Sequence, residues 1–461
     1  MTESYRTAYA AQHEAATARL GELRAQGMSR FDAQGFPPAR DEEWRFTPIT
    51  PLTRSEFVPA SAPAEALTRE QVSRFTFGHP EWPVLVFVNG RFAPELSSVP
   101  ALPAGTTTSS LAEALVRWPA LVEPHLARQV GPEATPFTAL NAAFIQDGAF
   151  VRIPAGVQLD TPIQICFLTS ADAGRVMTHP RNLIVVEAGA RAALIESYHA
   201  VGGEDRRGPA KTGENASETG LAHSRPSSPL VAPYFTNAVT EVVLGEGSWV
   251  EHARIQRESE SAYHIAFSHV LQGRESHYRS FALSMGAAIS RHNLHTRLDA
   301  PETEALLYGL SIGRGEQIVD NHTAIYHDQP DCRSWEVYKT ILDQKSRGVF
   351  NGKVFVKPEA QKTDAKQTNR TLLLSEEARI DTKPQLEIFA DDVKCTHGAA
   401  VGYLDELPLF YFRSRGVPAE NARRLLTYAF AAEVLDEVHV EPVRVELERL
   451  VRERLGVLEP V

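Results

Sequence analysis

The stretch Trp249-Val-Glu-His-Ala-Arg-Ile-Gln256 decides the fold class of this chain of 461 residues. In it, Ala253 and Ile255 alternate with polar side chains, and a period of two predicts a β-strand. Similar short apolar runs recur from about residue 149 onward, with Gly, Asn, Asp or Pro between them. The runs that we predict as strands are 149–153, 163–168, 183–186, 192–197, 238–244, 249–256, 262–271, 277–283, 305–310, 317–325, 335–342, 349–356, 368–374 and 385–389.

The spacing of these runs excludes one large fold class and favours another. No helical segments separate the predicted strands, which excludes a doubly wound α/β sheet. A sandwich, a barrel and a β-solenoid remain, although no strict internal repeat is present. The solenoid fits best, because turns of about 20–30 residues can stack so that each buries the apolar face of the next. We therefore predict a mainly β protein with a β-solenoid core.

Regions with other patterns flank this core. Residues 1–148 are predicted to form a mainly helical N-terminal domain, 149–402 the β core and 403–461 a helical C-terminal domain. Within the first region, 84–88 reads as a strand that runs into a hairpin turn at Asn89-Gly90. The segment 202–229 is rich in Gly, Glu, Arg, Ser and Pro, which predicts a disordered loop.

The C-terminal region shows helical periodicity. Leu426, Phe430 and Val434 recur at intervals of four residues, and Pro442 separates this stripe from a second one. Such stripes usually pack into a core. After a solenoid, two helices of this kind are expected either to cap its open end or to offer a docking surface.

Composition narrows the possible partners and the compartment. The formal net charge of −11 disfavours nucleic acid as the main partner, since phosphate binding relies on clustered Lys and Arg. No apolar run is long enough to span a membrane. The N-terminus lacks a basic start and an apolar stretch, so we expect no signal peptide. Three cysteines, Cys166, Cys332 and Cys395, do not suggest a disulfide framework, and we expect a protein of the reducing cytoplasm.

Familiar catalytic motifs do not fit. Gly348 and Gly352 are separated by three residues rather than the four of a phosphate-binding loop, and Val354 stands where that loop has Ser or Thr. If ATP is used, another chain binds it. The pairs His292/His295 and His322/His327 are spaced like metal ligands, but we expect them to be surface strand or turn residues.

The best candidate for chemistry is Asp391-Asp-Val-Lys-Cys-Thr-His-Gly398. In an extended conformation, Cys395 and His397 point to the same face, about 7 Å apart. A thiolate and an imidazole together suit iron, zinc or persulfide sulfur. A buried cysteine beside a surface histidine would give the same pattern, so spacing alone leaves both interpretations open.

Longer motifs carry a family resemblance. They are Val349-Phe-Asn-Gly-Lys-Val-Phe-Val356, Ala360-Gln-Lys-Thr-Asp-Ala-Lys-Gln-Thr-Asn369, Pro384-Gln-Leu-Glu-Ile388, Asp391-Asp-Val-Lys-Cys-Thr-His-Gly-Ala399 and Leu409-Phe-Tyr-Phe-Arg-Ser-Arg-Gly416. Together they strongly resemble the SufB/SufD family of iron–sulfur cluster assembly proteins, densely over 305–440 and loosely over 137–300. The segment Glu43-Trp-Arg-Phe-Thr47 is similar to one in the SufD branch. Phe412 stands where the SufB branch has a key cysteine, which argues against a role as primary sulfur acceptor.

The resemblance implies a fold and a role. The fold is a right-handed parallel β-helix with helical domains at both ends. The role is that of a non-catalytic scaffold subunit that pairs with SufB and binds the ATPase SufC through its C-terminal helices, where Leu426, Phe430 and Val434 lie. Cys395 and His397 match positions at the SufB–SufD interface, where a nascent iron–sulfur cluster is thought to form. The resemblance leaves flavin binding and homodimer formation open.

Two other functions are compatible with parts of the sequence. A β-helix polysaccharide lyase or hydrolase would need a carboxylate pair, and Asp391-Asp392 is the adjacent acidic pair that fits this idea best. Neighbouring strand residues point to opposite faces, so this pair cannot easily act on one sugar bond. A structural interaction protein without cluster chemistry is the second alternative.

Overall fold

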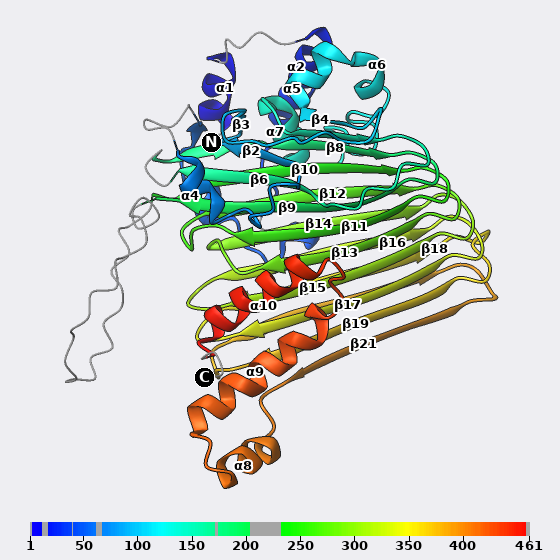
Figure 1. Ribbon diagram of the computed structural model, residues 1–461. Helices are drawn as coiled ribbons and strands as arrows, with labels where there is room; N and C mark the ends of the chain where they lie inside the picture. The colour runs from blue at the N-terminus through cyan, green and yellow to red at the C-terminus, as the bar shows by residue number, and fades with distance from the viewer. Residues whose placement is uncertain are drawn as a thin grey trace.

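The computed structural model describes residues 2–11, 17–38, 40–60, 67–170, 174–202 and 232–457. Most of it is a β-solenoid, with helices at its N-terminal end and beside its sheets (Figure 1). The loop predicted at 202–229 lies outside these ranges, apart from Gly202.

Two mainly parallel sheets form the walls of the solenoid. Sheet A contains β4 (Thr107–Ser110), β5 (Ala149–Ile153), β8 (Arg181–Val186), β10 (Phe235–Leu244), β12 (Tyr263–Gln272), β14 (Ile289–Leu298), β16 (Ile318–His327), β18 (Arg347–Val356) and β20 (Arg379–Ile388), with β1 (Val58–Pro59) and β7 (Val176–Thr178) at its side. Sheet B contains β3 (Arg91–Phe92), β2 (Val84–Val88), β6 (Ile163–Ser170), β9 (Arg191–Val201), β11 (Trp249–Arg257), β13 (His277–Ser284), β15 (Glu304–Gly313), β17 (Arg333–Leu342), β19 (Asp364–Leu373) and β21 (Lys394–Gly402).

Each turn of the solenoid contributes one strand to each sheet. The pairs β5/β6, β8/β9, β10/β11, β12/β13, β14/β15, β16/β17, β18/β19 and β20/β21 make eight turns. Consecutive turns are hydrogen-bonded in parallel and without a break in register from β14 to β20. The prediction of a mainly β, solenoid-type fold with helical regions on both sides is confirmed.

The space between the sheets holds an apolar core in which polar side chains are embedded. Leu194, Val242, Leu294 and Ile325 are among the apolar side chains that fill it. Glu196 of β9 accepts a hydrogen bond at 2.9 Å from Thr240 of β10, across the gap between sheets. Because inner-face residues recur at every second position, polar ladders can run along the axis of the solenoid.

The N-terminal region contributes both helices and strands. β2 extends sheet B by pairing with β6, and β4 extends sheet A by pairing with β5. The predicted hairpin is present: β2 and β3 pair antiparallel, and Asn89 and Gly90 both have positive φ. The helices are α1 (Thr2–Ala10), α2 (Ala18–Gln34), the 3-10 helix Glu42–Trp44, α3 (Thr50–Arg54), α4 (Arg69–Ser73), α5 (Leu111–Arg117), α6 (Pro119–Val122) and α7 (Pro136–Phe144).

The C-terminal helices lie beside the solenoid. They are α8 (Glu406–Ser414), α9 (Ala419–Leu435) and α10 (Glu441–Leu455), and α9 and α10 pack against the outer face of sheet B (Figure 1). The buried Lys339 of β17 fixes α9 by donating a hydrogen bond at 2.8 Å to the carbonyl oxygen of Phe430. Most residues of the last strand, β21, are exposed to solvent. None of the described helices is long and apolar enough to cross a membrane.

Candidate functional site

The predicted pair Cys395 and His397 lies on β21, the outermost strand of sheet B. In the parallel register, Cys395 pairs with Ala365 and His397 with Gln367, both on β19. Ala365 and Gln367 are buried residues of the inner face. Cys395 and His397 therefore continue two inner-face columns to the exposed end of the solenoid, where no further strand among the described residues covers them.

The two side chains differ in their surroundings. Cys395 is half-buried, and burial raises the pKa of its thiol above the ordinary value, while a hydrogen bond with the backbone of Ala365 lowers it in part. His397 is exposed. No group of three or more His, Cys, Asp and Glu residues that could hold a metal occurs in the part of the chain that the structure describes. One thiol and one imidazole amount to two of the four ligands of a tetrahedral site.

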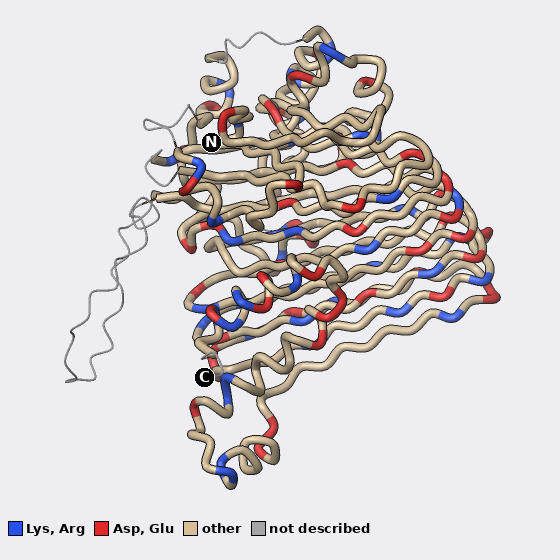
Figure 2. The backbone as a smooth tube through the Cα atoms, viewed as in Figure 1, with Lys and Arg blue, Asp and Glu red and all other residues tan. Residues whose placement is uncertain are grey.

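The acidic pair next to this strand has a structural role. The Lys362 ammonium group contacts the Asp392 carboxylate, and the Gln361 side chain accepts a hydrogen bond from the Asp392 amide at 2.9 Å. Contacts of this kind between neighbouring turns recur along the solenoid, where Lys and Arg alternate with Asp and Glu (Figure 2). Asp392 is therefore engaged in holding two turns together.

The structure separates the histidines of each predicted pair. His292 faces the interior, where it lies 3.0 Å from the Ser268 hydroxyl, whereas His295 packs against the Phe267 ring with 4.6 Å between ring centroids. His322 contacts carboxylates, and His327 lies 2.9 Å from the Ser334 hydroxyl. All four are strand residues, as expected, but the predicted surface position is wrong for His292, His322 and His327, which are buried. His292 and His327 point between the sheets, and the segment that contains Glu43 covers His322.

The helical stripe predicted to bind a partner faces the solenoid. Val434 is 1% exposed, and Leu426 and Phe430 are partly buried. Leu425 of α9 and Val445 of α10 reach solvent singly, whereas exposed apolar side chains gather on α8 and the last solenoid turn: Phe389, Val401, Tyr403, Leu407, Phe410 and Tyr411. A helical stripe marks the buried face of a helix. The signal for the exposed face was the run Leu407-Pro-Leu-Phe-Tyr-Phe412, which is apolar all round.

The segment Glu43–Thr47 is anchored to the outer face of sheet A. The Arg291 guanidinium carbon lies 3.9 Å from the centroid of the Trp44 ring, and Arg291 also forms an ion pair with Asp320 at 3.3 Å. The Thr47 hydroxyl contacts the same carboxylate. This motif therefore joins the N-terminal region to the solenoid.

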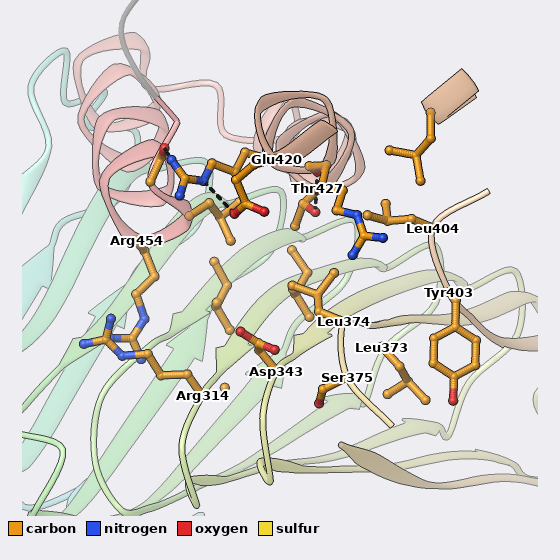
Figure 3. Close-up of a pocket in the computed structure, with 18 of the residues that line it drawn as sticks. Arg314, Asp343, Leu373, Leu374, Ser375, Tyr403, Leu404, Glu420, Thr427 and Arg454 are labelled. Atoms are coloured by element: carbon orange, nitrogen blue, oxygen red, sulfur yellow. Dashed lines mark hydrogen bonds and ion pairs between the residues drawn. The ribbon is translucent and has the colours of Figure 1, made fainter. Parts of the chain in front are cut away.

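A cavity of about 1100 Å³ lies between the C-terminal helices and the solenoid (Figure 3). Arg314, Asp343, Glu420 and Arg454 are among its lining residues. Two of its arginines share one partner: Arg454 pairs with Glu260 at 2.7 Å and Arg314 with the same carboxylate at 2.6 Å. The cavity is the seam between two packed parts, and nothing in it resembles the thiol and imidazole of β21.

Known proteins of one family are similar to this chain over most of its length. The model of the SUF system FeS cluster assembly SufBD core domain matches residues 167–430, and that of the SufBD protein N-terminal region matches 1–165. An iron–sulfur cluster assembly SufBD family protein of Synechocystis is 37% identical, covering 90% of this chain and 87% of its own. The iron–sulfur cluster assembly protein SufD of Escherichia coli is 29% identical over 93% and 92% of the two chains. The chloroplast protein ABCI7 of Arabidopsis thaliana is 29% identical over 92% and 84%.

Proposed function

The chain belongs to the SufBD family of iron–sulfur cluster assembly proteins, and we propose that it is a non-catalytic scaffold subunit of a SUF assembly complex. In this proposal it pairs with SufB, binds the ATPase SufC, and helps to hold a nascent iron–sulfur cluster at the SufB–SufD interface. The protein works in the cytoplasm, where its three free cysteines stay reduced.

One observation carries this proposal: Cys395 and His397 sit together on an uncovered edge strand. An exposed edge strand presents unpaired N–H and C=O groups, and a second strand can pair with it. A partner that adds its own strand would bring its side chains next to Cys395 and His397. The incomplete ligand set would then be completed across the interface, and the cluster is cargo that both chains share.

The residues present indicate which cluster ligands this chain supplies and which come from the partner. His397 is the main contribution of this chain to the cluster, as a ligand or as a proton-handling group, and Cys395 gives a supporting thiolate. Phe412 stands in the position of the SufB cysteine, so the primary sulfur-accepting thiol belongs to the partner. In isolation, the same free edge can pair with a second copy of this chain and give a homodimer.

The surface for SufC is formed by the C-terminal helices. Phe430 and Val434 hold α9 against sheet B, which fixes the position of the neighbouring helices, and Leu426 of the same stripe is partly buried. Leu407 and Phe410 of α8 are exposed apolar side chains without a covering element among the described residues. A patch of this kind is typical of a protein–protein contact.

The alternatives gain less support. A polysaccharide lyase needs carboxylates aimed at one bond, but Asp392 is bound to Lys362 and lies in a surface turn. A structural protein without cluster chemistry would share the open edge with the assembly scaffold. The two differ only in whether the assembled complex carries iron and sulfide.

The experiment compares His397→Ala with Thr396→Ala, a matched exposed position on β21 whose side chain points to the opposite face. Both variants are expected to form the complex and to hydrolyse ATP. Iron and acid-labile sulfide in the purified complex should fall several-fold with His397→Ala and stay unchanged with Thr396→Ala. Cys395→Ser should give a milder loss. Full iron and sulfide content with His397→Ala would contradict the site, though not the family.

A further inference from the structure

A column of three polar side chains leads from the open edge into the solenoid. His397 of β21 pairs in register with Gln367 of β19, and Gln367 pairs with Glu336 of β17. Neighbouring strands are about 4.8 Å apart, so the backbone of Glu336 lies about 10 Å below that of His397. Gln367 donates a hydrogen bond at 2.7 Å to one carboxylate oxygen, Oε2, of Glu336. The column therefore joins the candidate site to a fully buried carboxyl group.

The inner faces around this column carry polar oxygen atoms that the protein does not pair. They belong to buried side chains of β17 and β19, and none has a hydrogen-bond partner among the described residues: Glu336 Oε1, Tyr338 OH, Gln367 Oε1, Asn369 Oδ1 and Thr371 Oγ1. A buried polar atom left unpaired is costly, and proteins usually satisfy such atoms with internal water. Internal water would satisfy these atoms and would give protons a route along the column.

The opposite wall is shaped to leave room for the column. Gly352 of β18 faces Gln367, and a Cβ atom at this position would lie 2.3 Å from Gln367 Nε2. Any side chain there would push Gln367 away from Glu336. The absence of a side chain at Gly352 thus preserves the link between Gln367 and the buried carboxyl group.

The electrostatic surroundings of Glu336 differ from those of the buried Glu196, whose neighbours His252 and Arg254 favour the ionised form. Its inner-face neighbours are Leu307 of β15, Thr323 of β16, Gln367 of β19 and Tyr338 of its own strand, whose ring packs against Phe350 of β18. Among these only Tyr338 can ionise, and burial together with the charge of Glu336 raises the pKa of that hydroxyl well above its ordinary value. Arg254, farther along the interior, lowers the same pKa in part.

The result is a carboxyl group that titrates near neutrality. Burial raises the pKa of Glu336 from its ordinary value of 4.5 to about 7, while Thr323 and Gln367 offset part of that effect. An acid or base works best when its pKa lies near the working pH. Glu336 can therefore both take up and release a proton under cellular conditions.

We propose that Glu336 is the internal proton acceptor for cluster chemistry at the Cys395–His397 edge, reached through hydrated space beside Gln367. This inference rests on the proposed function. Metal binding by thiols releases protons. A partner strand on β21 would close the edge to solvent, so a released proton needs an internal acceptor. The carboxylate of Glu336 binds that proton, becomes a neutral carboxylic acid, and returns the proton to water when the edge opens.

The first test is infrared spectroscopy of the purified chain. The difference spectrum between wild type and Glu336→Gln should contain the C=O stretching band of a carboxylic acid at pH 6 and lose it by pH 8. The matched control is Glu196→Gln, because His252 and Arg254 outweigh the effect of burial and lower the pKa of Glu196 to about 2. That variant should lose no acid band at either pH. Absence of the band for Glu336 at pH 6 would overturn the proposal.

A second variant keeps this test decisive if Glu336→Gln does not fold. Gln367→Met preserves side-chain length but removes the amide that donates to the carboxylate. The ionised form of Glu336 then loses a hydrogen bond, so its acid band should persist to higher pH than in the wild type. An unchanged titration in Gln367→Met would show that the column does not reach Glu336.

The second test links the carboxyl group to the reaction. Cluster formation is followed in the complete complex, and the rate with Glu336→Gln is divided by the wild-type rate at each pH, so that the pH dependence of the other subunits cancels. The ratio should fall about tenfold between pH 6 and pH 8, as the wild-type carboxyl group ionises. A constant ratio would overturn the proton role. Normal cluster content in His397→Ala would instead overturn the edge assignment, so the two failures are distinguishable.

Discussion

At the scale of single residues, two buried glutamates of sheet B show how neighbouring side chains in the solenoid interior determine whether a carboxyl group is ionised. The Glu196 carboxylate lies 3.4 Å from His252 and 3.8 Å from Arg254. Although burial alone would raise the pKa of Glu196, these partners hold it at about 2. Among the described residues no such cation affects Glu336, and burial raises its pKa to about 7. Near neutral pH, the glutamate on β9 is thus ionised, whereas the glutamate on β17 can gain or lose a proton.

This difference predicts how stability depends on pH. Glu336 has an ordinary pKa of 4.5 when unfolded and about 7 when folded. As pH rises from 4.5 to 7 the unfolded chain loses its proton first, so the contribution of Glu336 to stability, present below 4.5, is lost. Between pH 5 and pH 8, Glu336→Gln should gain about 2–3 kcal/mol in free energy of unfolding relative to the wild type. Denaturant unfolding at both pH values measures this gain, and an equal difference at the two pH values would contradict it.

Residue types in one strand could be predicted, but contacts between strands could not. A period of two sufficed to place Cys395 and His397 on one face, and the register agrees. The sequence did not predict that Glu336 and Gln367 lie in line with His397, because the strand pairings that align them join residues 30 and 31 positions apart. A single sequence shows no register between strands that are so far apart in the chain. The buried part of the column could therefore be identified only from the structure.

At the scale of elements, the polar side chains on the inner face of one strand explain why the sequence did not predict it. β14 was not among the predicted strands, since its inner face carries Ser290, His292 and Thr296 beside its two leucines. A polar interior removes the apolar alternation that a strand prediction depends on. The turn length also drifts: paired residues are 27 apart from Ser280 to Leu307 and 29 apart from Leu307 to Glu336. For this reason no strict repeat is visible in the sequence.

The helices make a prediction about the ATPase contact. Phe410 of α8 is 67% exposed, so Phe410→Asp should change stability by no more than about 0.5 kcal/mol while weakening SufC binding. Val445→Asp on α10, which is 56% exposed, is the matched control and should bind normally. Pull-down of the ATPase with each variant measures this. Equal binding by both variants would remove α8 from the docking surface.

At the scale of the whole molecule, the two ends of the solenoid are treated differently. The N-terminal end is closed by α2, α7 and neighbouring elements, which pack against the first turns (Figure 1). The opposite end carries β20 and β21, whose side chains are exposed or only half-buried. Long uncovered edge strands invite pairing with another chain, and most proteins avoid them. An uncovered edge strand that carries a thiol and an imidazole is suited to pairing with another protein chain.

The backbone of β21 shows how to test that assembly. The Lys394 amide donates to the Thr363 carbonyl oxygen on the β19 side, so by alternation the amides of Cys395, His397 and Ala399 point to the free edge. Ala399→Pro removes one of these outward donors without breaking the ladder to β19. It should weaken pairing with SufB about tenfold, whereas Ala399→Ser, which keeps the amide, should pair normally. Titration calorimetry of the heterodimer measures both, and wild-type affinity in Ala399→Pro would show that the partner does not dock by adding a strand here.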